Sequence, residues 1–257
     1  MKKQSYIYCL LMLLASAPLF GQEEDIDETR LFYRSDVSGG AFIHSNGVGA
    51  FYRRSKRITG FKKKFLSFEL LNMKHPKEHK SYNPYIENTK GFAYGKLNSL
   101  FILRTAVGYQ KTIYSKETKR GVEIGYLLTA GPELGFVKPV FLEIAYPNVA
   151  SYIYLSTERY DPERHNQNNI YGRASALKGI EDLSLYPGLQ LKFGWNFEYG
   201  AMDESIRALE TGLTLDAFYK EVPIMAGFPV GDPDAKPKNH QFFISLYLAF
   251  QFGKKFF

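Results

Sequence analysis

The carboxyl-terminal stretch QFFISLYLAFQFGKKFF (residues 241–257) decides the fold that the sequence predicts. From Phe242 to Phe252 every second residue is large and apolar, whereas Ser245 and Gln251 between them are polar. A period of two residues is typical of a β-strand with two unlike faces. One face is too apolar for water, and the other carries groups that a fully buried core strand would not. A strand of about ten residues with these faces is typical of a transmembrane β-barrel.

The first 21 residues predict a secretory signal peptide. Lys2 and Lys3 form a positively charged start, and residues 6–20 form an apolar run that ends beside the small residue Gly21. This run is shorter than the roughly 20 residues that a spanning helix needs. The sequence therefore predicts an exported protein whose mature chain begins with a short acidic periplasmic tail, residues 22–29.

Composition excludes several classes of function. The single cysteine, Cys9, lies in the predicted signal peptide, so the mature chain has no thiol for disulfides or cysteine chemistry. Without Lys2 and Lys3, the 33 Lys and Arg residues fall to 31 against 26 Asp and Glu, which leaves a net charge of +5. This excess suits anionic lipid head groups but is too small and scattered to indicate nucleic acid.

Seven further stretches show the same alternation of apolar and polar residues. They cover residues 33–45, 48–55, 65–73, 97–113, 122–145, 187–199 and 209–219. The dipeptide Asn46-Gly47 between the first two is the strongest short-range signal for a two-residue hairpin turn. With residues 122–145 counted as one strand, the sequence predicts an all-β fold, an antiparallel up-and-down transmembrane barrel of eight strands. Pairing of residues 140–145 with residues 133–137 would instead make ten strands.

The lengths of the connections agree with a barrel. We expect residues 30–257 to form a single domain whose chain starts in the periplasm, so that successive strands run outward and inward. Three of the four outside connections are then long, residues 147–185 forming the longest extracellular loop, and the inside connections are all short. Transmembrane barrels show this asymmetry.

The two faces of the strands supply the candidate functional residues. Charged residues of both signs on the inner face predict an interior network of Glu69, Arg104, Glu123, Lys192, Glu210 and Asp216. Because eight strands enclose an interior that side chains fill, we expect these charges to pair with one another, and a proton or solute pathway is the alternative. The apolar residues of the other face are predicted to contact lipid: Phe101, Leu103, Leu189, Leu191, Phe193, Trp195, Leu213, Leu215, Ile244, Leu246, Leu248 and Phe250.

Two other groups of residues contain the side chains that bind metals. His75, Glu78 and His79 match the H-x-x-E-H spacing of one class of zinc peptidases, but that chemistry needs both histidines on one helix face. The segment is a proline-flanked connection between strands, so we expect a solvated loop. Asp161, Glu163 and His165 are loosely spaced, and we expect a surface loop there as well. The sequence predicts neither a metal nor a cofactor.

A basic bend follows the second predicted strand. Its residues are Arg53, Arg54, Lys56, Arg57, Lys62, Lys63 and Lys64. Long cationic side chains at a membrane boundary extend toward lipid phosphates, so the bend predicts the periplasmic rim of the barrel. A docking site for another envelope protein is the alternative.

The signal peptide, the alternating strands and the aromatic terminus resemble the Gram-negative outer-membrane β-barrel proteins with a small barrel domain. The resemblance covers nearly the whole mature chain, but it is one of pattern and matches no member of known activity. It implies a location in the outer membrane, in contact with outer-membrane lipid and lipopolysaccharide. Phe257 resembles the C-terminal aromatic residue that the barrel-assembly machinery recognises, although Lys254 and Lys255 separate the final aromatics from the alternating strand.

The function that we expect is non-enzymatic: a structural or accessory component of the envelope whose extracellular loops bind a partner protein. A narrow channel or transporter for small solutes is the first alternative. An outer-membrane lipid hydrolase is the second, because His44-Ser45-Asn46 resembles the His and Ser of outer-membrane lipid A deacylases and phospholipases. Those enzymes need a nucleophile hydrogen-bonded to its base, whereas neighbouring residues of a strand point to opposite faces. A hairpin turn explains the same residues.

Overall fold

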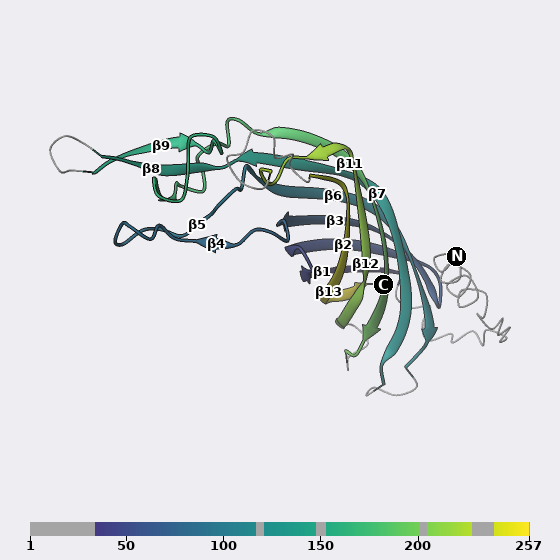
Figure 1. Ribbon diagram of the computed structural model, residues 1–257. Coiled ribbons are helices and arrows are strands. Elements are labelled where there is room, and N and C mark those ends of the chain that lie inside the picture. Colours follow the sequence, from purple (N-terminus) through teal and green to yellow (C-terminus); the bar gives the residue numbers. More distant parts are fainter. Residues whose placement is uncertain (1–33, 117–120, 148–152, 201–204, 228–238, 257) are drawn as a thin grey trace, which may run out of the picture.

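The computed structural model describes residues 34–116, 121–147, 153–200, 205–227 and 239–256. The predicted signal peptide and acidic tail lie outside these residues. Eight antiparallel strands form a closed barrel in which each strand pairs with the next along the chain and the last pairs with the first (Figure 1). They are β1 (Ser35–His44), β2 (Gly47–Thr59), β3 (Lys62–Met73), β6 (Asn98–Tyr114), β7 (Glu123–Pro139), β11 (Ser184–Glu198), β12 (Ser205–Val222) and β13 (His240–Phe256).

The two ends of the barrel differ. At one end, here called the loop end, lie the β1–β2 turn and the connections from β3 to β6, from β7 to β11 and from β12 to β13. At the other, the turn end, lie the remaining three connections together with Ser35 and Phe256, where the first and last strands begin and end. None of the described residues forms a helix long and apolar enough to cross a membrane.

The prediction of eight barrel strands is confirmed, and the ten-stranded alternative is wrong. Residues 122–145 do not fold back on themselves within the barrel. β7 pairs with β6 and β11 along its whole length, and the chain then continues past the loop end as β8 (Phe141–Pro147). The second strand also extends further than predicted, because the alternation continues through the basic bend as far as Thr59.

The hairpin between β1 and β2 is shifted by one residue from the predicted turn. His44 pairs with Gly47, so the two turn residues are Ser45 and Asn46 rather than Asn46 and Gly47. This register sets Phe42 opposite Gly49, where a Cβ atom would lie 2.4 Å from the tip of the Phe42 ring. The missing side chain of Gly49 therefore makes room for the ring inside the barrel.

Two structured segments project beyond the loop end. The long connection after β7 was expected to be irregular, but it contains β9 (Ile153–Arg159) and β10 (Ile170–Arg173), which pair with the two edges of β8. The connection after β3 contains the short hairpin of β4 (Lys80–Ser81) and β5 (Phe92–Ala93). We call these segments together the extension (Figure 1).

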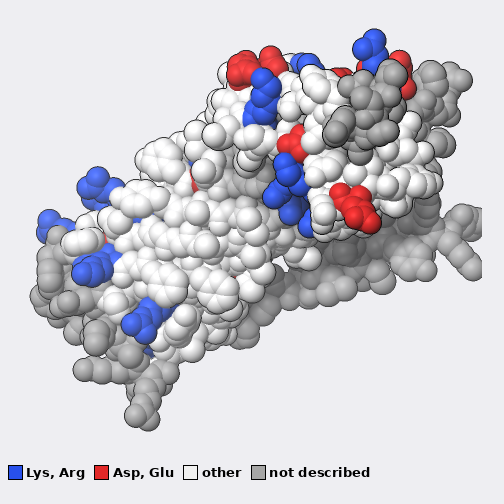
Figure 2. All heavy atoms as spheres, turned by 90° about the vertical axis from the view of Figure 1, so that its left-hand side faces the viewer, with Lys and Arg blue, Asp and Glu red and all other residues white. Residues whose placement is uncertain are grey.

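A small apolar core joins the two parts of the extension. Its buried residues are Phe92, Leu142, Ile144, Tyr160 and Ile170. Asn83, in the β4–β5 connection, also donates hydrogen bonds from its amide to the carbonyls of Asn168 (2.9 Å) and Ile170 (2.8 Å). Figure 2 views the molecule from the side on which the extension projects, and most of that surface is uncharged, with Lys, Arg, Asp and Glu in separate small groups.

The strands alternate between a polar inner face and an apolar outer face. On β11, Gln190, Lys192 and Asn196 are buried inside the barrel, whereas Leu189 (66% exposed) and Leu191 (52% exposed) point outward. The same pattern recurs around the ring. The barrel therefore has the opposite polarity to a globular domain in water, with its charged groups inside and its apolar side chains outside.

The loop-end part of the interior is an exception, because it is filled by apolar side chains. Its buried residues include Phe42, Phe51, Leu71, Met73, Leu100, Ile102, Val137, Phe218, Ile224 and Phe243. Ile224 comes from the β12–β13 connection rather than from a strand. We call the segment 223–226 the plug segment.

Candidate functional site

Three cationic side chains from three different strands are buried in the middle of the barrel. Arg53 on β2, Arg104 on β6 and Lys192 on β11 each expose 2% or less of their surface. The period of two places each of them on the inner face of its strand. Removing such charges from water costs several kcal/mol per ion, so each needs close partners.

Arg104 contacts three carboxylates. Its guanidinium lies 3.3 Å from Glu69, 3.3 Å from Glu133 and 2.5 Å from Asp216, which come from β3, β7 and β12. Each of these contacts uses a different guanidinium nitrogen. Arginine suits this position because its planar fork carries five donors in fixed directions. One residue therefore ties together the walls of the barrel from four strands.

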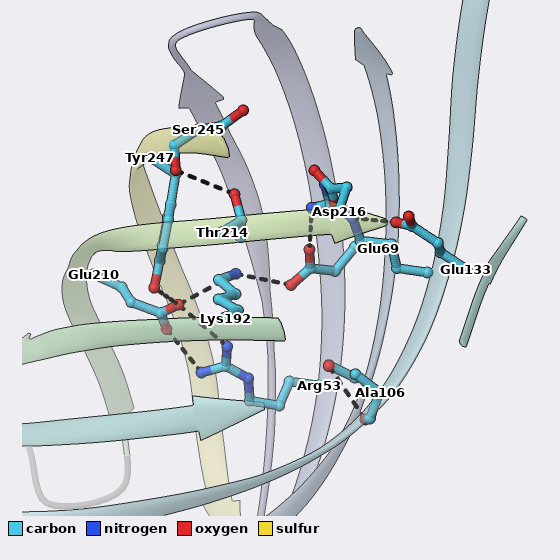
Figure 3. Close-up of polar contacts among 12 residues, drawn as sticks. Arg53, Glu69, Ala106, Glu133, Lys192, Glu210, Thr214, Asp216, Ser245 and Tyr247 are labelled. Atoms are coloured by element: carbon cyan, nitrogen blue, oxygen red, sulfur yellow. Dashed lines mark hydrogen bonds and ion pairs between the residues drawn. The ribbon is translucent and has the colours of Figure 1, made fainter. Parts of the chain in front are cut away.

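Lys192 extends the network toward the turn end. Its ammonium group lies 2.8 Å from Glu69 and 3.4 Å from Glu210. Arg53 in turn donates a hydrogen bond of 2.9 Å to Glu210. The charged groups thus form one continuous chain across the interior, with Glu69 and Glu210 each shared by two cations (Figure 3). We call this chain, from Arg53 to Asp216, the interior network.

Tyr247 on β13 contacts both Glu210 and Lys192. The Tyr247 hydroxyl donates to Glu210 at 2.9 Å, and the Lys192 ammonium lies 4.2 Å from the centre of the Tyr247 ring. Gly194 faces this hydroxyl, and a Cβ atom there would lie only 2.0 Å from it. The absence of a side chain on Gly194 therefore allows Tyr247 to reach across the interior to Glu210.

The network is nearly balanced in charge. Among the described residues it contains three cations, Arg53, Arg104 and Lys192, and four carboxylates. Buried ion pairs of this kind add little net stability, but removal of one partner is strongly destabilising because it leaves an uncompensated charge. The arrangement therefore fits a rigid, filled interior in which each charge depends on its neighbours.

A neutral polar layer lies on the turn-end side of the network. The Gln110 amide donates to Asn196 (3.4 Å), Asn196 donates to Gln251 (3.2 Å), and Gln251 donates to the Ser38 hydroxyl (2.7 Å). These residues come from β6, β11, β13 and β1. Side chains thus span the interior at this level as well.

Two groups of ion pairs lie beyond this layer, toward the turn end. Lys63 is 3.3 Å from Asp36, and Glu198 is paired with Lys255 (2.8 Å) and Lys116 (3.6 Å). All of these lysines are mostly buried, with 11–16% of each side chain exposed. Charged side chains therefore occupy the turn end of the interior too.

The plug segment closes the loop end. The backbone amides of Leu97 and Asn98 donate to the carbonyl of Ile224 (2.9 and 3.3 Å), and the Asn98 side chain donates to the carbonyl of Pro223 (2.6 Å). The amide of Ala226 donates to the carbonyl of Gly95 at 2.8 Å. These bonds hold Ile224 against the apolar cluster of the interior.

Five of the six residues predicted from the sequence to face inward contact one another in the interior network. They are Glu69, Arg104, Lys192, Glu210 and Asp216. The sixth, Glu123, lies at the turn end opposite Glu198 and accepts a hydrogen bond of 2.8 Å from Thr112. It is half-buried on the inner face of β7, away from the level of Glu210.

The sequence does not predict two members of the interior network, Arg53 and Glu133, or the neighbouring Tyr247. Arg53 was assigned to the periplasmic rim with the rest of the basic bend, and this is wrong, because it is 1% exposed and pairs with Glu210. Glu133 lies in the predicted strand 122–145 on the same face as Glu123 but is not among the predicted inward residues, because it follows Pro132. Tyr247 is not among the predicted inward residues, although it lies on the same face of β13 as Ser245 and Gln251. In each case the signal was the same period of two, carried through to the end of the strand.

The residues predicted to contact lipid all lie on the outer face. Their exposed fractions range from 36% for Leu215 to 70% for Ile244, and Leu248 is half-buried. Their full set is Phe101, Leu103, Leu189, Leu191, Phe193, Trp195, Leu213, Leu215, Ile244, Leu246, Leu248 and Phe250. Tyr126 and Trp195 meet edge to face on this surface at 6.5 Å between ring centres.

The H-x-x-E-H segment forms a turn and not a helix. The ring of His75 stacks on His240 at 6.1 Å, and Glu78 pairs with Lys96 at 2.6 Å. Burial, and to a lesser extent the charge of His240, lowers the pKa of His75 below its usual value of 6.5. The side chains of this segment therefore serve contacts within the loop end.

The other two local groups also have structural contacts. Asp161 accepts a backbone hydrogen bond from Glu163 (3.0 Å), and His165 contacts Glu158 (3.3 Å). No group of three or more His, Cys, Asp and Glu residues within the described ranges is arranged to hold a metal ion. His44 is two residues from Phe42 and lies on the same inner face of β1, whereas Ser45 is exposed in the turn. The two side chains are therefore not arranged as a base and a nucleophile.

Comparison with known proteins gives little beyond the architecture. No protein family model matches the sequence, and no curated protein matches it. Among solved structures, the crystal structure of Neisserial surface protein A is similar at 9% sequence identity, over 87% of this chain and 96% of that one, with a TM-score of 0.39. At this level of similarity the assignment of an eight-stranded barrel rests on the strand pairing described above.

Proposed function

We propose that this protein is an integral β-barrel of a Gram-negative outer membrane, without enzymatic activity, that serves as a structural or accessory component of the envelope. The observation that carries the proposal is the inverted polarity of a closed barrel. Charged and polar residues fill the middle and the turn end of its interior, and apolar residues such as Leu189 and Ile244 cover its outside. Outer-membrane lipid and lipopolysaccharide are the surroundings that this outer surface would contact.

The outer surface supports a membrane location on energetic grounds. Exposed apolar area costs about 25 cal/mol per Å² in water, and a large contiguous apolar patch marks an interaction with membrane or protein. The aromatic group of Tyr126, Phe193 and Trp195 lies on the outer wall toward the turn end, as in the aromatic belts of membrane proteins. A lipid bilayer would bury the whole wall at once.

The extension is the part of the molecule that we propose to bind a partner protein. It projects from the loop end, which carries the long connections and would face the outside of the cell. A groove of about 390 Å³ lies between the β4–β5 hairpin and the β8–β10 sheet. Its lining includes Lys74, Lys80, Lys138 and Arg173 together with Glu78, so an acidic partner surface would be complementary to it.

The filled interior argues against the alternative function as a channel. The interior network, the amide layer and the plug segment each place side chains across the barrel. Eight strands enclose an interior just wide enough to be filled by side chains. The positions of His44 and Ser45 argue against a lipid hydrolase, because their side chains do not face one another.

Fractionation of a Gram-negative host that expresses the full chain tests the proposal. We expect the protein in the outer membrane, released by detergent but retained after washing with high salt and alkali. Unheated samples should migrate as a compact form in gel electrophoresis, and heating should convert them to an unfolded form. Recovery of the folded protein as a soluble periplasmic species would refute the proposal.

A further inference from the structure

Four cationic side chains converge on one part of the outer wall, near the turn end. Arg54 and Lys56 point outward from β2, Lys64 points outward from β3, and Arg34 lies just before β1. Together they line a groove of about 600 Å³. We call this groove and its four cations the basic wall groove.

The cations of the basic wall groove are crowded. Lys56 and Lys64 are directly opposite one another on neighbouring strands, and Arg54 is one position along the same face, opposite Leu66. Like charges in opposite cross-strand positions destabilise a sheet unless a counter-charge lies between them. Within the described ranges, none of the four cations is paired with a carboxylate, whereas Arg53, Lys63 and Arg104 on the inner face all are.

The other side of the groove is apolar. Leu66 and Val107, which face each other across β3 and β6, line it together with the cations. They are 41% and 68% exposed and belong to the apolar outer surface of the barrel. Tyr109 lies opposite Lys64, and aromatic residues of this kind mark the boundary between lipid and water. The groove thus has a cationic part near the turn end and an apolar part further along the wall, toward the loop end.

We infer that the basic wall groove binds a lipid of the membrane leaflet at the turn end, an anionic glycerophospholipid such as phosphatidylglycerol. Its phosphate would accept hydrogen bonds from Arg54, Lys56 and Lys64, and its acyl chains would follow Leu66 and Val107. Arginine and lysine are the preferred ligands of phosphate, and a volume of 300–1,000 Å³ is usual for a ligand site. The site rests on the proposed membrane location and adds to it the class of lipid and the leaflet.

An amphiphile fits the groove better than a soluble anion does. A free phosphate would satisfy the cations but would leave the apolar side of the groove uncovered. The acidic segment 23–28 of this chain is the other occupant to be tested, because five of its six residues carry the opposite charge and it precedes Arg34 in the sequence.

Native mass spectrometry of the full mature chain, released from bilayer nanodiscs, tests the inference. Nanodiscs of phosphatidylglycerol and phosphatidylcholine in equal amounts supply an anionic and a zwitterionic lipid with the same glycerophosphate core. We expect the wild type to retain phosphatidylglycerol preferentially. Arg54→Gln should weaken that retention by about tenfold, since a hydrogen bond to a charged group is lost.

Arg207→Gln is the matched control. Arg207 is also an exposed arginine on the outer wall near the turn end, but it lies on β12 and does not line the groove. We expect less than a twofold change in retained phosphatidylglycerol for this variant. Equal losses from Arg54→Gln and Arg207→Gln would overturn the inference, as would equal retention of the two lipids by the wild type.

Two further measurements separate the other occupants. If inorganic phosphate displaces phosphatidylglycerol completely at equal concentration, the groove recognises phosphate alone and the lipid assignment is wrong. If phosphatidylglycerol is retained only after the acidic residues of segment 23–28 are changed to amides, that segment is the occupant. A chain that enters the nanodisc without lipid preference refutes only this inference, whereas a chain that stays in aqueous solution refutes the proposed function.

Discussion

Arg104 is the residue with the largest number of ion pairs in the interior network. It pairs with Glu69, Glu133 and Asp216, which expose 4% or less of their surface, and Glu69 has Lys192 as a second partner. We expect Arg104→Gln to lower the free energy of unfolding by about 3–5 kcal/mol, because three buried carboxylates lose their shared partner. Urea unfolding in lipid vesicles, followed by the fluorescence of Trp195, measures this.

Arg207→Gln serves as the control for this change, because Arg207 is exposed on the outer wall. Its effect should stay within about 0.5 kcal/mol. If both variants unfold at the same urea concentration as the wild type, the interior network is not a source of stability.

The hydrogen bond from Tyr247 to Glu210 crosses the interior and does not follow from the strand pairing alone. Tyr247→Phe keeps the ring beside Lys192 but removes the donor to Glu210. A hydrogen bond to a charged group contributes about 1.5–3 kcal/mol, and we expect a loss of that size in the same unfolding measurement. Tyr126→Phe, on the outer wall, is the matched control, and a loss as large there would contradict the role assigned to Tyr247.

At the scale of elements, the plug segment decides whether the loop end is closed. Ile224 is 1% exposed, and its carbonyl accepts the amides of Leu97 and Asn98. Ile224→Ala should cost about 2–5 kcal/mol, through lost burial and the cavity that remains. In the same variant, hydrogen exchange at the amide of Leu97 should become faster, because this amide donates to the carbonyl of residue 224.

Ile180→Ala provides the comparison, because Ile180 is 47% exposed in the β10–β11 connection. Its effect on hydrogen exchange at Leu97 should be negligible. Unchanged exchange in Ile224→Ala would show that the plug segment does not hold this end of the barrel.

The contact between β13 and the connection after β3 predicts a dependence on pH. Since the pKa of His75 is lowered in the folded protein, its neutral form contributes stability that is present above pH 6.5 and is lost as the pH falls through the folded value. Nuclear magnetic resonance of the His75 ring in detergent should therefore give a pKa below 6.5. His240→Gln should raise that value by removing the electrostatic contribution of His240, which is smaller than the effect of burial. A normal pKa in the wild type would contradict this assignment.

The elements also show how far sequence patterns reach. All eight barrel strands were predicted, because the period of two is a local property of an extended backbone. The ends of strands were predicted less well. β2 continues past the predicted end at residue 55 to Thr59, because a basic bend resembles a turn when its partner strand is unknown. The strand predicted over residues 122–145 instead ends at Pro139, and the residues after it belong to β8 of the extension. β9 and β10 are not predicted, because these strands are short and lie among polar residues.

At the scale of the whole molecule, the filled interior predicts a barrel that does not conduct ions. Purified protein inserted into a planar bilayer should give no steady steps of current, because side chains cross the interior at the apolar cluster, the interior network, the amide layer and the Lys255 ion pair. A porin measured in the same bilayer shows that insertion would be detected. Steady open steps from the wild type would favour the channel and reject the filled barrel.

The sequence by itself determined the class of fold and the face on which each side chain lies. Glu69, Arg104, Lys192, Glu210 and Asp216 were placed inside because alternation depends only on the geometry of one strand. Only the tertiary structure decided which charges meet. Arg53 and Glu210 are 157 residues apart, and their contact depends on the register of every strand between them and on closure of the ring. Pairing between distant strands is a property of the closed barrel, and no single stretch of the chain contains it.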